Sequence, residues 1–248
     1  RLRRRGDAWP WYRTVLVLTS MALLVWITQG APMVYGQVSF SGHMTEHMVL
    51  AMMAPLPLAL SAPVTLALRA LPARTDGSRG PRAWLRWFLV SLWMKVLANP
   101  LFAAVNFAGS LVVFYYSPLF EMALRNHAGH IVMVVHFMAA GYLFANALIG
   151  VDPSPGRPSH PMRLVLLLST MAFHAFFGIS LMTSETLLAP TWYGLMGRAW
   201  GADAISDQQY GGQIAGGLGE LPTLSLAIGV GTVWRAADAK ERKRRDRK

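Results

Sequence analysis

The stretch Ser41-Gly42-His43-Met44-Thr45-Glu46-His47-Met48 opens a long apolar run and holds two histidines, two methionines and a carboxyl group within six residues. Residues four apart on a helix share one face, so the side chains of His43 and His47 can point at the same ion or cofactor. The stretch therefore predicts a helix that enters an apolar environment with ligand-type side chains in its first turns.

The composition predicts an all-α membrane protein. The chain has 248 residues, of which 54% are hydrophobic and only 14% are charged, and it contains nine tryptophans. These values are unlike those of a soluble domain or a disordered chain. The chain has no cysteine, which excludes disulfides, thiolate metal ligands and cysteine nucleophiles. Any metal must therefore be held by His, Met or carboxylate groups.

The net charge of +11 does not point to nucleic acid, because the basic residues gather at the two ends and between the apolar runs. We interpret this charge as a topology signal. No cleavable signal peptide is visible, and the chain begins with Arg rather than Met. This start is compatible with a piece of a longer protein that carries an upstream domain.

The apolar runs predict a polytopic bundle of about six transmembrane helices plus one interfacial helix. We place the transmembrane domain at residues 12–235, between a basic segment at 1–11 and a basic tail at 236–248. The predicted spans are residues 12–29, 43–71, 101–117, 128–150, 162–188 and 209–234.

Two stretches between these runs are not expected to cross the membrane. Residues 30–42 contain Gly, Pro and Ser, and predict a linker. Residues 84–97 repeat apolar positions at helical spacing but are too short to cross a bilayer, so they predict a helix at the membrane interface. Within the second span, Pro55, Pro57 and Pro63 predict a kink or a partly unwound segment.

The distribution of basic residues predicts that both termini are cytoplasmic. Six crossings put the two termini on one side, and that side then receives nearly all of the 23 lysines and arginines. Such an excess marks the cytoplasmic side of a membrane. We interpret the basic tail as a solvated anchor with affinity for anionic lipid of the bilayer.

This topology gathers ligand-type residues near the non-cytoplasmic side. His43 and His47 enter the second span from that side, His127 and His130 enter the fourth span there, and Asp207 opens the sixth. Ionisable groups within spans are costly and usually face the bundle interior or a water-filled cavity, which favours a functional site. Alternatively, each histidine only bonds a backbone carbonyl or a serine on a neighbouring helix.

We predict that His43, His47, His130 and His136 are metal ligands, although His136 lies about 120° around its helix from His130. His174 lies near the middle of the fifth span, and Glu220 lies beside a proline within the sixth. Some further residues are close to these histidines in the sequence or are expected at a similar depth in the membrane. They form a possible second shell: Met44, Met48, His127, Asp207, His174 and Glu220.

Copper is the metal that best suits a set of His and Met ligands without Cys, because thioethers bind Cu(I) well whereas zinc gains little from them. Most of the methionines are better explained as flexible fillers around kinked helices, and the exceptions are Met44 and Met48, which flank the histidine pair. His43-Met44-Thr45-Glu46-His47 also matches H-x-x-E-H, the inverted zinc-peptidase signature, but the downstream helix offers no obvious third carboxylate ligand. A haem b protein with histidine pairs from two helices and a scaffold without metal are further alternatives.

Several motifs, in this order, resemble those of the CtaG-type cytochrome c oxidase assembly factors of bacteria. The resemblance is to the actinobacterial form, in which this domain often follows a copper-resistance-D-like membrane domain. The matching motifs cover nearly the whole chain: His43-Met44-Thr45-Glu46-His47-Met48, Asn99-Pro100, Ser117-Pro118-Leu119, Gly150-Val151-Asp152-Pro153, His174-Ala175-Phe176-Phe177-Gly178, Asp207-Gln208-Gln209 and Gly219-Glu220-Leu221-Pro222.

The resemblance implies a membrane protein, not an enzyme, that matures a haem-copper oxidase by helping copper to reach it. The implied partners are oxidase subunits and a copper donor protein. The chain departs from the family pattern at two places. Many members have a histidine directly before the proline that matches Pro118, and many have another histidine four residues after the one that matches His130, where this chain has Val134. The resemblance therefore supports His43 and His47 more strongly than the second half of the site.

Overall fold

A computed structural model describes residues 2, 6–74, 78–149, 151–154, 156 and 158–245, with the side chains of 240, 241 and 244 left aside. The described residues form helices and no strand, which confirms the all-α prediction. The helical elements, in chain order, are α1 (Trp11–Gln29), α2 (Ala31–Val38), α3 (Phe40–Met48), the π-helical η2 (Val49–Met53), α4 (Pro55–Leu60), α5 (Pro63–Ala70), α6 (Pro81–Val90), α7 (Leu92–Leu97), α8 (Pro100–Tyr115), α9 (Pro118–Arg125), α10 (His127–Ile149), α11 (His160–Met182), the 3-10 helix η3 (Tyr193–Leu195) and α12 (Ala204–Arg245).

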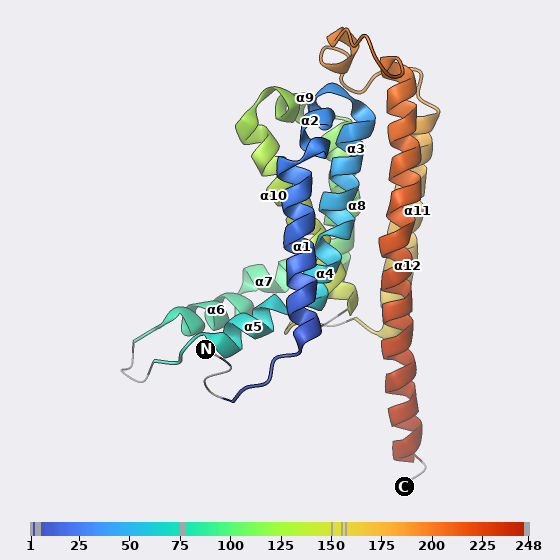
Figure 1. The fold of residues 1–248 in the computed structure, drawn as a ribbon. Helices are drawn as coiled ribbons and strands as arrows, with labels where there is room; N and C mark the ends of the chain where they lie inside the picture. Colours follow the sequence, from blue (N-terminus) through green and yellow to red (C-terminus); the bar gives the residue numbers. More distant parts are fainter. Residues whose placement is uncertain are drawn as a thin grey trace.

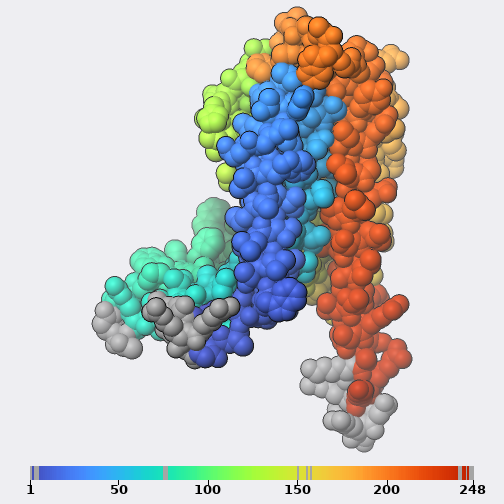
Figure 2. Space-filling view, viewed as in Figure 1, coloured from blue at the N-terminus to red at the C-terminus, as the bar shows by residue number. Residues whose placement is uncertain are grey.

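The long helices run side by side, and the short helices α5, α6 and α7 project sideways at one end (Figure 1). Helix α1 begins and α12 ends toward that same end of the molecule. Figure 2 shows the sideways arm and the last turns of α12 protruding from the body of the bundle. The exposed faces of α6 and α7 carry three tryptophans, Trp84, Trp87 and Trp93, as expected for helices at a membrane interface.

Four to six helices of the described residues are long and apolar enough to cross a membrane, which fits a multi-pass membrane protein. The predicted number of six is reached when two bent helix pairs each count as one span. The first pair joins Phe40–Leu60 to Pro63–Ala70 with a bend of 43°, and the second joins Pro100–Tyr115 to Pro118–Arg125 with a bend of 76°. The other four candidate spans are Trp11–Val38, His127–Ile149, His160–Met182 and Ala204–Ala239.

The structure differs from the sequence predictions at several helix ends. The predicted linker 30–42 is largely helical, because only Gly30 and Ser39 are extended and Pro32 near the start of α2 favours a new helix. The predicted interfacial helix 84–97 is two helices, because Ser91 is extended and its hydroxyl accepts a hydrogen bond from the backbone N–H of Met94. Helix α11 ends at Met182, six residues before the predicted end of its span at 188.

The π-helical segment η2 follows directly after α3 and is where the second span departs from α-helical geometry. Pro55 has no N–H to donate to the carbonyl of Ala51, and the N–H of Ala54 bonds the carbonyl of Val49 instead, at 2.8 Å. Gly141 of α10 packs against the backbone of η2, since a Cβ on this glycine would lie 2.0 Å from the Ala51 oxygen. The predicted interruption of the second span is therefore a π segment that a glycine on α10 accommodates.

Two further features hold the bundle together. Helices α11 and α12 approach closely at Gly178 and Gly212, where a Cβ on Gly212 would lie 2.7 Å from the Gly178 oxygen. Asp152, in the loop after α10, is fully buried and accepts hydrogen bonds from the backbone N–H groups of Val64 and Thr65 at 3.1 and 2.8 Å. Asp152 therefore caps the start of α5 and ties the sideways arm to the bundle.

We predict that Gly141→Ala lowers the free energy of unfolding by about 1–3 kcal/mol, because the added methyl group overlaps the backbone of the π segment. Gly109→Ala in α8 is the matched control, since a Cβ there meets nothing within 4 Å. Thermal unfolding of both variants in detergent checks this. Equal melting temperatures for Gly141→Ala and Gly109→Ala would show that α10 does not pack against η2 as described.

Candidate functional site

Four polar side chains form a cluster inside the bundle, which we call the α3–α10 cluster: His43, Glu46 and His47 of α3, and His130 of α10. Each is at most 4% exposed. The Nε2 atom of His130 lies 3.3 Å from Oε1 of Glu46, although this contact lacks hydrogen-bond geometry. His130 therefore lies next to α3, the helix that carries His43 and His47, as expected from the sequence. Its nearest polar neighbour there is Glu46.

The polar atoms of the α3–α10 cluster lack hydrogen-bond partners among the described residues. This holds for both ring nitrogens of His43, His47 and His130 and for both carboxyl oxygens of Glu46. Leaving a buried donor or acceptor unpaired costs about 1–3 kcal/mol, and native structures rarely do so without a reason. The alternative in which each histidine bonds a carbonyl or serine of a neighbouring helix is therefore not what the structure shows for these three rings.

Aromatic rings enclose the α3–α10 cluster. The His47 ring lies edge-to-face on Phe137, with centroids 4.4 Å apart, and the His43 ring lies 5.0 Å from Phe120. Tyr115 lies within 6 Å of both histidine rings. Rings of this kind keep water out and leave a medium of low polarity, in which a charge placed among the imidazoles interacts strongly with them.

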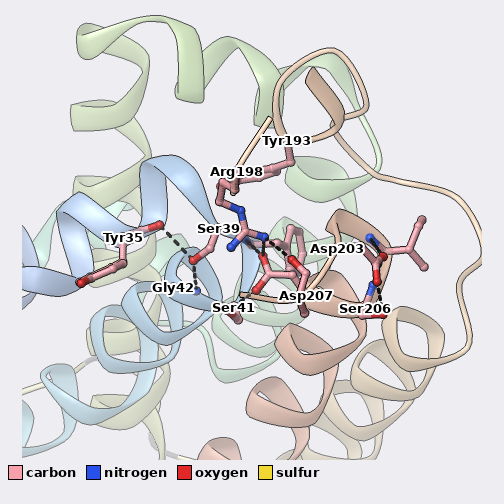
Figure 3. Close-up of polar contacts among 12 residues, drawn as sticks. Tyr35, Ser39, Ser41, Gly42, Tyr193, Arg198, Asp203, Ser206 and Asp207 are labelled. Atoms are coloured by element: carbon pink, nitrogen blue, oxygen red, sulfur yellow. Dashed lines mark hydrogen bonds and ion pairs between the residues drawn. The ribbon is translucent and has the colours of Figure 1, made fainter. Parts of the chain in front are cut away.

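Helix α3 is held in place by polar contacts at its first turn (Figure 3). Ser39 caps the helix, since its hydroxyl accepts from the N–H of Gly42 at 3.1 Å. Asp207 of α12, buried to 94%, accepts from the backbone N–H of Phe40 at 2.7 Å and from the hydroxyl of Ser41. Asp207 was predicted to stand near the ligands; the structure makes it a positioning residue that caps α3.

Arg198 and the α11–α12 loop (residues 183–203) complete this arrangement. Nη2 of Arg198 lies 3.4 Å from a carboxyl oxygen of Asp207. The next two residues of the motif hold the loop itself. The Gln208 side chain accepts from the N–H of Leu188 and donates to the Thr186 carbonyl, both at 2.9 Å, and the Gln209 amide donates to the Ser184 carbonyl at 3.2 Å. The Asp207-Gln208-Gln209 motif therefore joins α12 to α3 and to the loop that covers this end of the bundle.

Tyr193 in the α11–α12 loop closes the outer side of the cluster. Its hydroxyl donates to the carbonyl of Gly36 at 2.6 Å. A Cβ on Gly36 would lie 3.0 Å from Oε2 of Glu46, so the glycine lets α2 approach the cluster. Burial, together with the negative charges of Glu46 and Asp207, raises the pKa of the Tyr193 hydroxyl well above its ordinary value. The hydroxyl therefore remains a hydrogen-bond donor at all physiological pH values.

Three other predicted residues lie outside the cluster. His136 is exposed and lines a separate apolar groove of about 560 Å³ between α8, α9 and α10. His127 is exposed at the start of α10, and Met44 is fully buried and packs near Gly211 of α12. Helix α10 thus points His130 toward α3 and His136 away from it, as the angle of about 120° between the two residues around the helix predicts.

His174 and Glu220 line a second cavity, of about 250 Å³, which opens between α11 and α12. The His174 ring is 6% exposed and stacks on Phe107 with centroids 6.0 Å apart, whereas Glu220 is exposed. Met52 of η2 lines the same cavity. From the sequence, Met52 is better explained as a flexible filler than as a thioether ligand, although it follows Met48 by four residues.

In the part of the chain that the structure describes, no three or more His, Asp or Glu side chains are arranged as a metal site. The donor types of the α3–α10 cluster nevertheless suit a transition metal, since imidazole binds copper and the unpaired ring nitrogens are available as ligands. His43 and His47 stand on one face of α3, and His130 of α10 approaches Glu46, which lies between them in the sequence.

We predict that Asp207→Ala speeds hydrogen exchange of the backbone amides in the first turn of α3. The variant removes the acceptor of the Phe40 N–H and leaves Arg198 without its carboxylate, which costs about 1–3 kcal/mol and makes exchange on the order of tenfold faster. Glu121→Ala is the control, because it removes a half-buried carboxylate that pairs with Arg125 at 2.9 Å on α9, away from α3. If α3 exchanges at the same rate in both variants, Asp207 does not anchor this helix.

Comparisons with known proteins agree with these features. The family model of the cytochrome c oxidase caa3 assembly factor (Caa3_CtaG) matches residues 1–237. Uncharacterized proteins of Mycobacterium bovis and Mycobacterium tuberculosis are 44% identical over 247 residues, which is 99% of this chain and 37% of each relative. An uncharacterized protein of Mycobacterium leprae is 41% identical over 248 residues, which is 100% of this chain and 38% of that relative.

The chain thus spans little more than a third of the length of the curated relatives that it matches. No solved structure matches it. The family match covers nearly all of the chain, including α3, the π segment and α12. The chain belongs to the family of cytochrome c oxidase caa3 assembly factors.

Proposed function

We propose that this protein helps to assemble a haem-copper cytochrome c oxidase by handling copper at the extracytoplasmic face of the bacterial plasma membrane. Membership of the assembly-factor family supports the first part. One observation supports copper handling: His43, His47 and His130 are buried beside Glu46, and their ring nitrogens have no partner among the described residues. Ionisable groups held this way in a membrane bundle are typical of ion sites.

The donor set favours copper as the cargo. The chain has no cysteine, so the imidazoles of His43, His47 and His130 are the strongest ligands in the α3–α10 cluster. The carboxyl group of Glu46, 3.3 Å from His130, would offset the positive charge of the ion in surroundings of low polarity. The protein then acts as a non-catalytic carrier that binds copper and passes it on.

The charge distribution supports the orientation. The end of the bundle at α2, α9 and the α11–α12 loop holds Arg125 and Arg198, whereas the opposite end holds the arginines of α5 and α6 and the basic last turns of α12. Basic residues accumulate on the cytoplasmic side. The α3–α10 cluster then lies near the extracytoplasmic end, where a copper donor protein and oxidase subunits are the expected partners.

The bilayer-facing surfaces agree with a membrane role. Exposed apolar side chains cover α1 and the arm helices α6 and α7, and the arm lies across the direction of the long helices (Figure 1). Helices that lie across a bundle at its basic end sit well at a lipid headgroup layer. The basic side chains at this end therefore contact lipid headgroups of the bilayer, and no nucleic acid is expected as a partner.

We predict that the double variant His43→Ala/His47→Ala loses one bound copper ion per chain. The two imidazoles share one face of α3, so their removal leaves His130 and Glu46 as an incomplete site. Copper content and the absorption spectrum of the detergent-purified protein are the measurement.

His127→Ala is the matched control, since it removes an exposed histidine at the start of α10 and should leave the copper content unchanged. A double variant with the full copper content would contradict the proposal. A Soret band in the purified wild-type protein would instead favour the haem alternative.

A further inference from the structure

Three soft or nitrogen-bearing side chains converge on Gly219 of α12. The point where a Cβ of this glycine would lie is 3.5 Å from Cδ2 of His174, 3.6 Å from Sδ of Met52 and 3.9 Å from Sδ of Met48. His174 comes from α11, whereas Met48 and Met52, four residues apart, come from the end of α3 and from η2. They surround a space that is open because residue 219 has no side chain. We call this set the Gly219 cluster.

The His174 ring is placed for a ligand. It is 6% exposed, and neither ring nitrogen has a hydrogen-bond partner among the described residues. Cδ2, the ring carbon bonded to Nε2, is the His174 atom nearest to the point where a Cβ of Gly219 would lie. The stacked Phe107 ring, at an interplanar angle of 20°, holds the plane of the imidazole. The 250 Å³ cavity that His174 and Met52 line leads to this place.

The chemistry of the Gly219 cluster selects a soft ion. Two thioethers and one imidazole are ligands that Cu(I) prefers, whereas magnesium and calcium need oxygen ligands and zinc gains little from thioethers. Methionines also fill irregular gaps beside kinked helices. That role explains the flexible side chains next to η2, but it gives the buried nitrogens of His174 no partner.

We propose that His174, Met48 and Met52 form a Cu(I) site, one step deeper in the bundle than the α3–α10 cluster. The inference rests on the proposed function, because it names the oxidation state of the copper ion and a second site that binds it. His47 of the α3–α10 cluster directly precedes Met48 of the Gly219 cluster, so the two places are neighbours along one helix. The ion enters and leaves as Cu(I), so the transfer needs no electron donor or acceptor.

Two variants that keep the fold test the site by different means. Met48→Leu/Met52→Leu removes both sulfurs at nearly constant volume. Gly219→Ala keeps every ligand and fills the open space with a methyl group at 3.5 to 3.9 Å from its neighbours, which is ordinary contact. The controls are Met53→Leu, next to Met52 in η2, and Gly217→Ala, where a Cβ meets nothing within 4 Å.

The measurement uses the whole chain in detergent, without oxygen, titrated with Cu(I) against a chromogenic chelator, followed by X-ray absorption at the copper edge. The wild type is expected to bind two Cu(I) ions and to show sulfur among the ligands. Met48→Leu/Met52→Leu and Gly219→Ala should each lose one ion together with the sulfur signal, and both controls should keep two ions.

The outcomes separate the inference from the proposed function. An unchanged ion count and sulfur signal in Met48→Leu/Met52→Leu overturns the Gly219 cluster, whatever His43→Ala/His47→Ala does. An unchanged count in Gly219→Ala likewise overturns it, because the methyl group occupies the space assigned to the ion. Loss of the sulfur-bound ion in both variants, with His43→Ala/His47→Ala unaffected, supports the Gly219 cluster and overturns the site at the α3–α10 cluster.

Discussion

The bond between the Asp207 carboxylate and the first turn of α3 is the contact on which the site depends. It joins residues that are 167 apart in the sequence, and it fixes a helix that carries His43, Glu46 and His47 into an apolar interior. Burying such groups costs free energy, so the helix needs strong anchors at its polar end. Asp207 and Ser39 supply them, with Arg198 paired to Asp207, while Tyr193 holds the preceding helix α2 through the Gly36 carbonyl.

Small residues decide how near the helices come to that buried helix. Gly36 lets α2 approach Glu46, Gly141 lets α10 approach the π segment, and Gly219 leaves open the space that His174 and the methionines face. π-helical segments are frequent at functional sites, and here one follows directly after the helix that carries the ligand-type residues. Here it allows one continuous span to present His47 and Met48 in its α-helical part and Met52 just beyond.

Much of the fold follows from the sequence, because each long helix is apolar for most of its length. The breaks at Gly30 and Ser91 did not, since single extended residues end helices there without a change in hydropathy. For the site, helical spacing predicts the pairing of His43 with His47. It cannot tell whether Asp207 meets an ion or the N-terminus of a helix, because both attract a carboxylate, nor does it show that His130 faces Glu46.

The most direct test of the account is the copper content of the oxidase itself. In cells whose only copy of the full-length protein carries His43→Ala/His47→Ala, oxidase is purified and its copper and haem are measured together. The account predicts oxidase that keeps its haem and contains much less copper than oxidase from wild-type cells. Oxidase with a normal ratio of copper to haem, from cells that make the variant at wild-type levels, would contradict copper handling by the buried histidines of α3.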